Sequence, residues 1–146
     1  MSQPQTYKNH HRFHGWFHFF VAPILLINFI FTVVVFFRHL HFHPILHLWL
    51  AVIAFALVVL ATLTRTYALK VQDRVIRLEE QLRYQRLLTP EQLVAAQALT
   101  IRQIIGLRFA SDAELPALLM RAVSEKLSQN AIKQAVTVWR PDTFRV

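Results

Sequence analysis

The sequence predicts an all-α membrane protein: a two-transmembrane helical hairpin whose second helix extends as a cytoplasmic stalk, followed by a small bundle of short helices. Three observations carry this prediction. Two uncharged apolar runs occupy the first half of the 146-residue chain, all eight acidic residues follow residue 72, and the chain has only two glycines. Scarce glycine disfavours turn-rich β folds, and crossing a bilayer core of about 30 Å takes about 20 helical residues.

The first apolar run, residues 17–37, predicts a transmembrane helix that follows a cytoplasmic tail at residues 1–16. It is too long for the core of a signal peptide. The second run, residues 45–63, predicts the other transmembrane helix, and residues 38–44 suit a tight outer loop. Pro44 fits the first turn of the second helix, where its missing N–H would be unpaired in any case. Two buried helices of a soluble protein are the alternative, which the small polar surface of so short a chain disfavours.

The distribution of basic residues predicts the orientation, because loops on the cytoplasmic side of a membrane are enriched in Lys and Arg. The outer loop contains only Arg38. The basic residues near the other membrane ends are Lys8, Arg12, Arg65, Lys70, Arg74, Arg77 and Arg83. Both termini are therefore expected in the cytoplasm, and anionic lipid headgroups are expected partners of this basic flank.

The segment after the membrane is expected to be helical throughout. No glycine or proline interrupts residues 45–89, so the second helix can continue as a stalk over residues 64–88 before a small module at residues 89–146. Asp73 with Arg77 and Glu79 with Arg83 have the four-residue spacing of helical ion pairs.

Short polar sequences mark where the helices of the module begin. Thr89, Thr100, Ser111 and Ser128 are the expected capping residues. The expected core of the module consists of Leu107, Phe109, Leu115, Leu118, Leu119, Val123, Leu127, Ile132, Val136 and Trp139.

Three parts of the chain resemble a family of small bacterial membrane proteins of unknown function. They are Tyr7-Lys8-Asn9-His10 with Phe17-His18-Phe19-Phe20, Pro23 and Asn28; Leu107-Arg108-Phe109-Ala110-Ser111-Asp112-Ala113-Glu114-Leu115-Pro116; and Ile132-Lys133 with Trp139-Arg140-Pro141-Asp142 and Arg145-Val146. The resemblance spans nearly the whole chain. It implies a two-helix architecture in a bacterial membrane and supplies no activity, and we expect the membrane to be the inner one.

Histidine is the residue type with the clearest chemical potential. His39, His41 and His43 alternate, and His47 follows one helical turn later, a spacing at which imidazoles can converge on Zn²⁺, Cu²⁺ or Ni²⁺. The alternative is that they fill the lipid–water boundary, because the first 72 residues contain no carboxylate to orient them. His18 and His47 are weaker candidates for ligating a haem or a chlorophyll. They are expected at opposite membrane faces, so each would act alone within a larger complex.

A heptad pattern along the second helix predicts a packing seam with small side chains in the membrane segment and larger apolar side chains in the aqueous segment. The predicted helix-packing interface consists of Asn28, Ala54, Ala61, Ala68, Val71, Val75, Leu78 and Leu82. The simplest partner is a second copy in a parallel homodimer, in which Arg74 would face Glu79 of that copy. The alternative is that the seam packs on the first helix and on the chain's own terminal helices.

Composition excludes several functional classes. Without cysteine there is no disulfide scaffold, cysteine zinc site or cysteine nucleophile, and two glycines do not make a phosphate-binding loop. No histidine follows His47 to activate a serine of the module. The module also lacks the basic stripe that nucleic acid requires.

The sequence therefore predicts a non-enzymatic structural or interaction protein that presents its helical module to another membrane protein or to itself, with no cofactor. Two alternatives stay open. One is an accessory subunit of a larger energy-converting membrane complex that contains haem or pigment. The other is a histidine-rich, metal-binding membrane hairpin.

Overall fold

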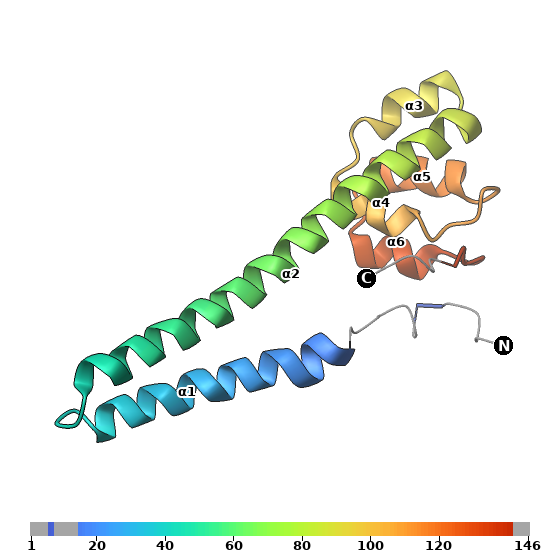
Figure 1. The fold of residues 1–146 in the computed structure, drawn as a ribbon. Coiled ribbons are helices and arrows are strands. Elements are labelled where there is room, and N and C mark those ends of the chain that lie inside the picture. Colours follow the sequence, from blue (N-terminus) through green and yellow to red (C-terminus); the bar gives the residue numbers. More distant parts are fainter. Residues whose placement is uncertain (1–5, 8–14, 142–146) are drawn as a thin grey trace. The chain divides into compact units, whose positions relative to one another are not determined.

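The computed structural model describes residues 6–7 and 15–141, and within these residues every regular element is a helix. The all-α prediction is confirmed at this level, together with two long apolar helices. The elements are a π-helix η1 (Phe17–Val21), α1 (Ala22–Arg38), α2 (Pro44–Leu87), α3 (Pro90–Ala96), α4 (Ile101–Leu107), α5 (Leu115–Ser124) and α6 (Gln129–Ala135) (Figure 1). The chain forms two compact units, residues 13–69 and residues 70–146 with 1–12.

In the unit of residues 13–69, α1 and the first part of α2 lie side by side and run in opposite directions (Figure 1). Their ring contacts occur in reverse order along the chain: Phe29 meets Phe55 at 5.5 Å between centroids, and His39 meets His47 at 5.6 Å. Further from the loop between the two helices, the guanidinium of Arg65, midway along α2, lies 5.9 Å from the ring of Phe17, the first residue of η1.

The apolar surfaces of these two helices are largely exposed among the residues that the structure describes. The most apolar stretch within Phe17–Arg38 has a mean hydropathy of 2.7 and is 0% buried, and that of α2 has a mean hydropathy of 2.5 and is 6% buried. The core helix of a soluble protein would be mostly buried. Both helices are long and apolar enough to cross a membrane.

The π-helix η1 lies directly before α1, whose second residue is Pro23. Proline has no N–H to donate and its ring clashes with the carbonyl four residues earlier, so the ordinary α-helical register is costly at this point. The wider turn of η1, in which the Ala22 N–H donates to the Phe17 carbonyl, precedes the proline without ending the helix.

Helix α2 is a single helix of 44 residues. It begins at Pro44 and continues to Leu87, as the absence of glycine and proline from residues 45–89 predicts. Its threonines return their hydroxyl hydrogen bonds to the helix, for example from Thr64 to the Leu60 carbonyl at 2.8 Å. Such bonds satisfy the polar groups within the helix itself.

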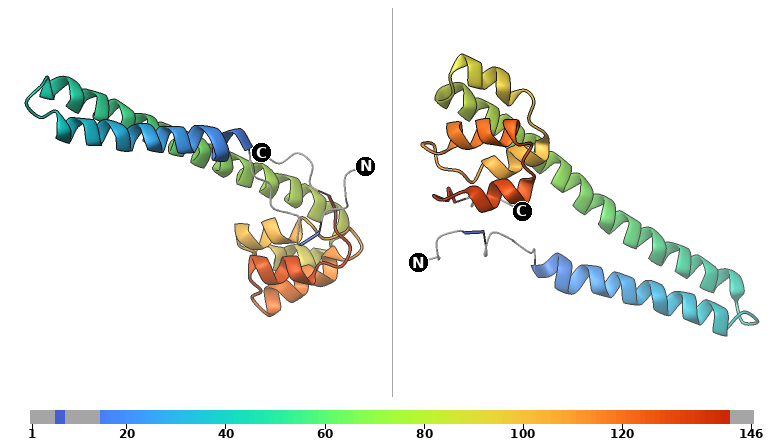
Figure 2. Two further views of the ribbon diagram at one scale, coloured as in Figure 1. Left: turned by 90° about the horizontal axis from the view of Figure 1, so that it is seen from below. Right: turned by 180° about the vertical axis from the view of Figure 1, so that it is seen from behind.

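In the unit of residues 70–146, the four short helices gather around the last turns of α2 (Figure 2). All ten predicted core residues lie in the core or pack against it. The core also contains Ile76, Tyr84 and Leu88, which the sequence analysis assigned to the stalk. The last turns of α2 are therefore part of the folded unit.

Three of the four predicted caps are confirmed. Thr89 and Thr100 each form a capping box, with Gln92 and Gln103 respectively, and the Ser128 hydroxyl accepts from the Ala131 N–H. The prediction of a helix start at Ser111 is wrong, because residues 111–114 form a turn and α5 begins at Leu115. The acidic side chains in this turn bind other segments instead of the helix end.

Candidate functional site

The most elaborate polar site is an ion-pair network that we call the Arg83 cluster, formed by Glu80, Arg83, Asp112 and Arg140. Arg83 lies at its centre and is 3% exposed. Its guanidinium donates from Nε to Asp112 Oδ1 at 2.8 Å, from Nη1 to Glu80 Oε2 at 3.2 Å and from Nη2 to the Ala110 carbonyl at 2.7 Å. Arg140 Nη1 donates to the other oxygen of Glu80 at 3.3 Å. The predicted pair of Glu79 with Arg83 is thus replaced by Glu80 with Arg83, three residues apart.

Backbone hydrogen bonds bring the contributing segments together. Ala110 and Trp139 form an isolated antiparallel bridge, with the Arg140 N–H donating to the Phe109 carbonyl at 2.8 Å and the Ser111 N–H to the Val138 carbonyl at 3.1 Å. Glu114 reinforces this pairing, because Oε1 accepts from both the N–H and the hydroxyl of Thr137 at 2.9 Å. The two segments that resemble a known family in sequence therefore lie next to each other.

An aromatic centre lies beside the Arg83 cluster. Phe109 is fully buried and its ring lies 4.9 Å from that of Trp139. Two buried cations approach the same ring: Arg108 Cζ at 4.6 Å from the centroid and Lys133 Nζ at 5.6 Å. Contact with an aromatic face partly offsets the cost of burying a positive charge.

Burial dominates the electrostatics of the Arg83 cluster. It raises the pKa of Glu80 above the ordinary value of 4.5, and the nearby Arg83 and Arg140 guanidinium groups only partly oppose this rise. Burial also raises the pKa of Tyr84, and the negative charge of Glu80 adds to the effect. The hydrogen bonds of Arg83 are all directed at groups of the chain itself. The chemistry of this arrangement is that of a clamp between segments.

The structure brings together two of the four histidines that were candidate metal ligands. His39 and His47 are in ring contact. His47 is half-buried, and His39, His41 and His43 are exposed. Among residues 6–7 and 15–141, no group of three or more His, Cys, Asp or Glu side chains lies close enough to hold a metal ion.

The two candidate cofactor ligands are not near each other. His18 lies in η1 and stacks on the edge of the Phe17 ring at 5.4 Å, whereas His47 lies in the first turns of α2. Phe17, next to His18, contacts Arg65, whereas His47 contacts His39 beside the loop. His18 and His47 are therefore at opposite ends of the helix pair.

The predicted helix-packing residues separate into two groups. Ala54 is 2% exposed, on the side of α2 that contacts α1, and Ala61 is half-buried. The other predicted residues are exposed: Asn28, Ala68, Val71, Val75, Leu78 and Leu82. Packing on the first helix thus accounts for the burial of Ala54 and Ala61, whereas the predicted seam residues from Ala68 onward are exposed.

Sequence reasoning missed the Arg83 cluster as a site. Apart from the bond between the neighbouring Glu80 and Arg83, the bonds that join its members span 29 positions, from Arg83 to Asp112, and 60 positions, from Glu80 to Arg140. One available signal was that Glu80 and Arg83 lie on the same helical face as Ile76, Tyr84 and Leu87, which favours burial. A second signal was the family resemblance of the segments that contain Asp112 and Arg140.

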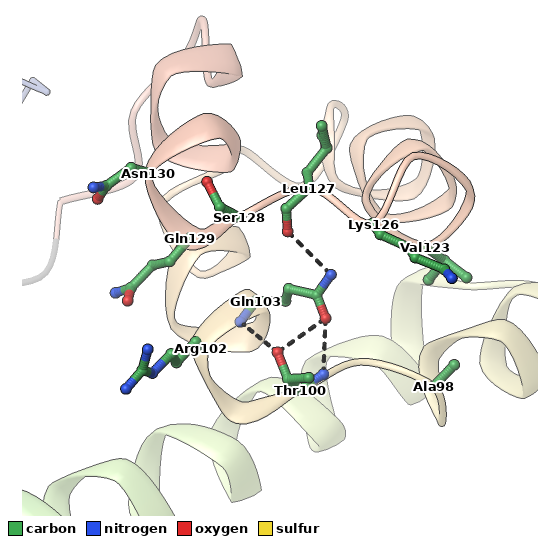
Figure 3. A pocket seen from close by; sticks show the side chains of 10 residues that line it. All are labelled: Ala98, Thr100, Arg102, Gln103, Val123, Lys126, Leu127, Ser128, Gln129 and Asn130. Carbon is green, nitrogen blue, oxygen red and sulfur yellow. Dashed lines mark hydrogen bonds between the residues drawn. The ribbon is translucent and has the colours of Figure 1, made fainter.

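A pocket of about 620 Å³ lies at the starts of α4 and α6 (Figure 3). Its main polar side chain, Gln103, accepts from Thr100 and donates to the carbonyls of Ala122 and Leu127 at 3.3 and 3.1 Å. Arg102 and Lys126 lie on different sides of the pocket in Figure 3. The central polar groups therefore hold the helix caps in place.

Together these features define an all-helical protein with two long, exposed apolar helices and a folded unit whose segments are joined by an ion-pair network around the buried Arg83 and Glu80. A family model covers residues 1–146, and the chain belongs to this family, which is described as a family of unknown function (DUF6526). No match was found among curated proteins or solved structures. The resemblance to an uncharacterised family is thereby confirmed.

Proposed function

We propose that this chain is a non-enzymatic interaction protein of a bacterial inner membrane, which anchors itself by a helical hairpin and presents the unit of residues 70–146 to a partner on the cytoplasmic side. The observation that carries this proposal is the lack of cover over the apolar helices. The stretches that are apolar enough to cross a membrane are 0% and 6% buried. An apolar surface of that extent requires lipid or another protein around it.

The contacts within the unit of residues 13–69 support a hairpin. Because α1 and α2 run in opposite directions, the two ends that would meet the cytoplasm, at Phe17 and Arg65, lie together. The His39–His47 contact closes the other end. A helix satisfies its own backbone hydrogen bonds, which is what the hydrocarbon layer demands.

The construction of the unit of residues 70–146 supports an interaction role. The charged residues that it buries are engaged with neighbouring parts of the chain, as Arg83 and Glu80 are in the Arg83 cluster. A partner would therefore bind the outer surface of this unit, whose segments are held together by the Arg83 cluster.

Cysteine labelling in intact cells tests the anchoring. The natural chain has no cysteine, so each variant carries a single thiol. Leu40→Cys, in the loop between α1 and α2, is expected to react with a membrane-impermeant maleimide. Ala117→Cys, on the exposed side of α5, is expected to react only after the cells are opened.

Labelling of both variants in intact cells would contradict the hairpin. Labelling of Ala117→Cys alone would show that the hairpin has the opposite orientation. Release of the protein from membranes at alkaline pH, without detergent, would contradict the proposal that the two helices are inserted in the membrane.

A further inference from the structure

An apolar row of side chains lies uncovered on α2 within the folded unit, and we call it the α2 stripe. It consists of Val71, Val75, Leu78 and Leu82, which are 59%, 47%, 58% and 54% exposed. The spacings of four, three and four residues place them on one face of the helix. Large apolar residues in a row, each about half exposed, indicate a surface that another protein covers.

The chain has already used the opposite face of the same helix. Ile76, Glu80, Arg83 and Tyr84 are 8%, 4%, 3% and 3% exposed and face the core and the Arg83 cluster. At about 100° per residue these residues lie roughly opposite the α2 stripe. The stripe therefore cannot join the core of its own unit without releasing the Arg83 cluster.

Opposite charges flank the α2 stripe. Arg74 lies on one side of it and Glu79 on the other, and both are exposed. Being five residues apart on opposite flanks, they are poorly placed to pair within one helix. In two parallel helices that pack stripe to stripe, Arg74 of each copy faces Glu79 of the other, as at the g and e positions of a coiled coil.

We propose that the α2 stripe is a self-association surface, and that its occupant is α2 of a second copy of this chain, parallel and in register. The parallel arrangement rests on the proposed function, because copies inserted in one membrane with the same orientation present α2 in the same direction. Confinement to one membrane also raises the effective concentration of the second copy. The higher effective concentration favours pairing even though the α2 stripe is too short to form a stable coiled coil between two chains that diffuse freely in solution.

Disulfide formation in native membranes tests the register. Val71→Cys and Leu82→Cys, at the two ends of the α2 stripe, are each expected to form homodimers under mild oxidation. Arg77→Cys is the matched control, because it is exposed on the same stretch of helix but points away from the stripe. An antiparallel pair would instead join Val71→Cys to Leu82→Cys when the two variants are mixed. That outcome, or equal crosslinking of all three single variants, overturns the proposal.

Charge reversal tests the partner's identity. Arg74→Glu in a Leu82→Cys background is expected to lower the crosslinked fraction by about two- to fivefold, the range for exposed ion pairs. The double variant Arg74→Glu/Glu79→Arg is expected to restore it, because the pairs re-form with the signs exchanged. Arg102→Glu, on the exposed side of α4, is the control and is expected to change nothing.

Crosslinking and alkaline extraction together distinguish a failure of self-association from a failure of membrane anchoring. If the chain resists alkaline extraction but no stripe cysteine crosslinks, the α2 stripe has a different occupant and the anchoring stands. If the chain is extracted, the anchoring fails. Crosslinking of the extracted chain then shows whether the stripe pairs without a membrane.

Discussion

The guanidinium of Arg83 connects parts of the chain that are remote in sequence. From a position that is 3% exposed it donates to Glu80 on its own helix, to Asp112 and to the Ala110 carbonyl. Each of these acceptors would lose a charged donor if the guanidinium were removed. Asp112 is exposed, so water can replace the donor there. Glu80 and the Ala110 carbonyl are buried, and their loss of a donor is costly because water does not reach them.

Arg83→Met is therefore expected to destabilise the unit of residues 70–146 by about 3–5 kcal/mol, the cost of breaking a buried ion pair from one side. Hydrogen exchange of the α4 and α5 amides in detergent measures this locally, without unfolding the apolar helices. Arg86→Met is the control, since Arg86 is exposed one turn further along α2. Similar exchange rates in the two variants would contradict a clamp at Arg83.

Glu80 is expected to make stability depend on pH in an unusual direction. Its pKa is raised in the folded chain by burial, so the folded chain holds this proton more tightly than the unfolded chain. The resulting stabilisation is fully present below the ordinary pKa of 4.5 and is lost as the pH rises through the raised value. Glu80→Gln has no such titration and keeps an acceptor for Arg83.

The stability of the natural chain relative to Glu80→Gln is therefore expected to fall as the pH rises from about 4.5 towards neutrality. The difference in opening free energy of the α4 amides between the two proteins, measured across this range, checks the sign. Taking the difference cancels groups that titrate equally in both. A difference that grows with pH would mean that Arg83 and Arg140 outweigh the burial of Glu80.

Among the elements, α4 packs closely against α6, and a glycine permits the contact. A Cβ built at Gly106 would lie 3.1 Å from Cγ2 of Ile132 and 3.2 Å from the Gln129 carbonyl oxygen. The second of these atoms belongs to the backbone and cannot move aside without shifting α6. The contact therefore depends on the absence of a side chain at this position.

Gly106→Ala is expected to destabilise the folded unit by about 1–3 kcal/mol, as overpacking of a filled core does, despite the higher helix propensity of alanine. Limited proteolysis across residues 101–135 would report the loss. Gly15→Ala is the matched control, since nothing lies within 4 Å of its added Cβ. Adding Ile132→Ala to Gly106→Ala removes the contact with Cγ2 but keeps those with the Gln129 carbonyl oxygen and the Cβ of residue 132, so it is expected to reduce the clash without abolishing it.

The elements themselves were largely predictable because their signals are local. Capping boxes at Thr89 and Thr100 involve residues three positions apart, and the length of α2 follows from an uninterrupted helical segment. The start of α5 was misplaced because Asp112 and Glu114 resemble residues of a first helical turn. In the folded chain they bind Arg83 and Thr137 instead, and those partners are not visible in a local pattern.

For the whole molecule, the sequence predicted the all-α class and two long apolar helices, because hydropathy and length decide both. It also predicted the core of the module, because apolar residues at helical spacing form one face of a helix, and that face is buried against its neighbours. It did not predict the Arg83 cluster. That site requires α2, the turn at residues 111–114 and the segment at residues 139–140 to meet, which only the tertiary structure determines.

The reach of Arg140 to Glu80 spans 60 positions of the chain, so the clamp cannot close while the ribosome is still making the residues between them. At about 5–20 residues per second, the nascent chain waits about 3–12 seconds after Glu80 is made. During that interval the Phe109 ring has no Trp139 against it, and Glu80 lacks one of its two arginines. The aromatic pair and the complete ion-pair network can therefore form only after synthesis has passed Arg140.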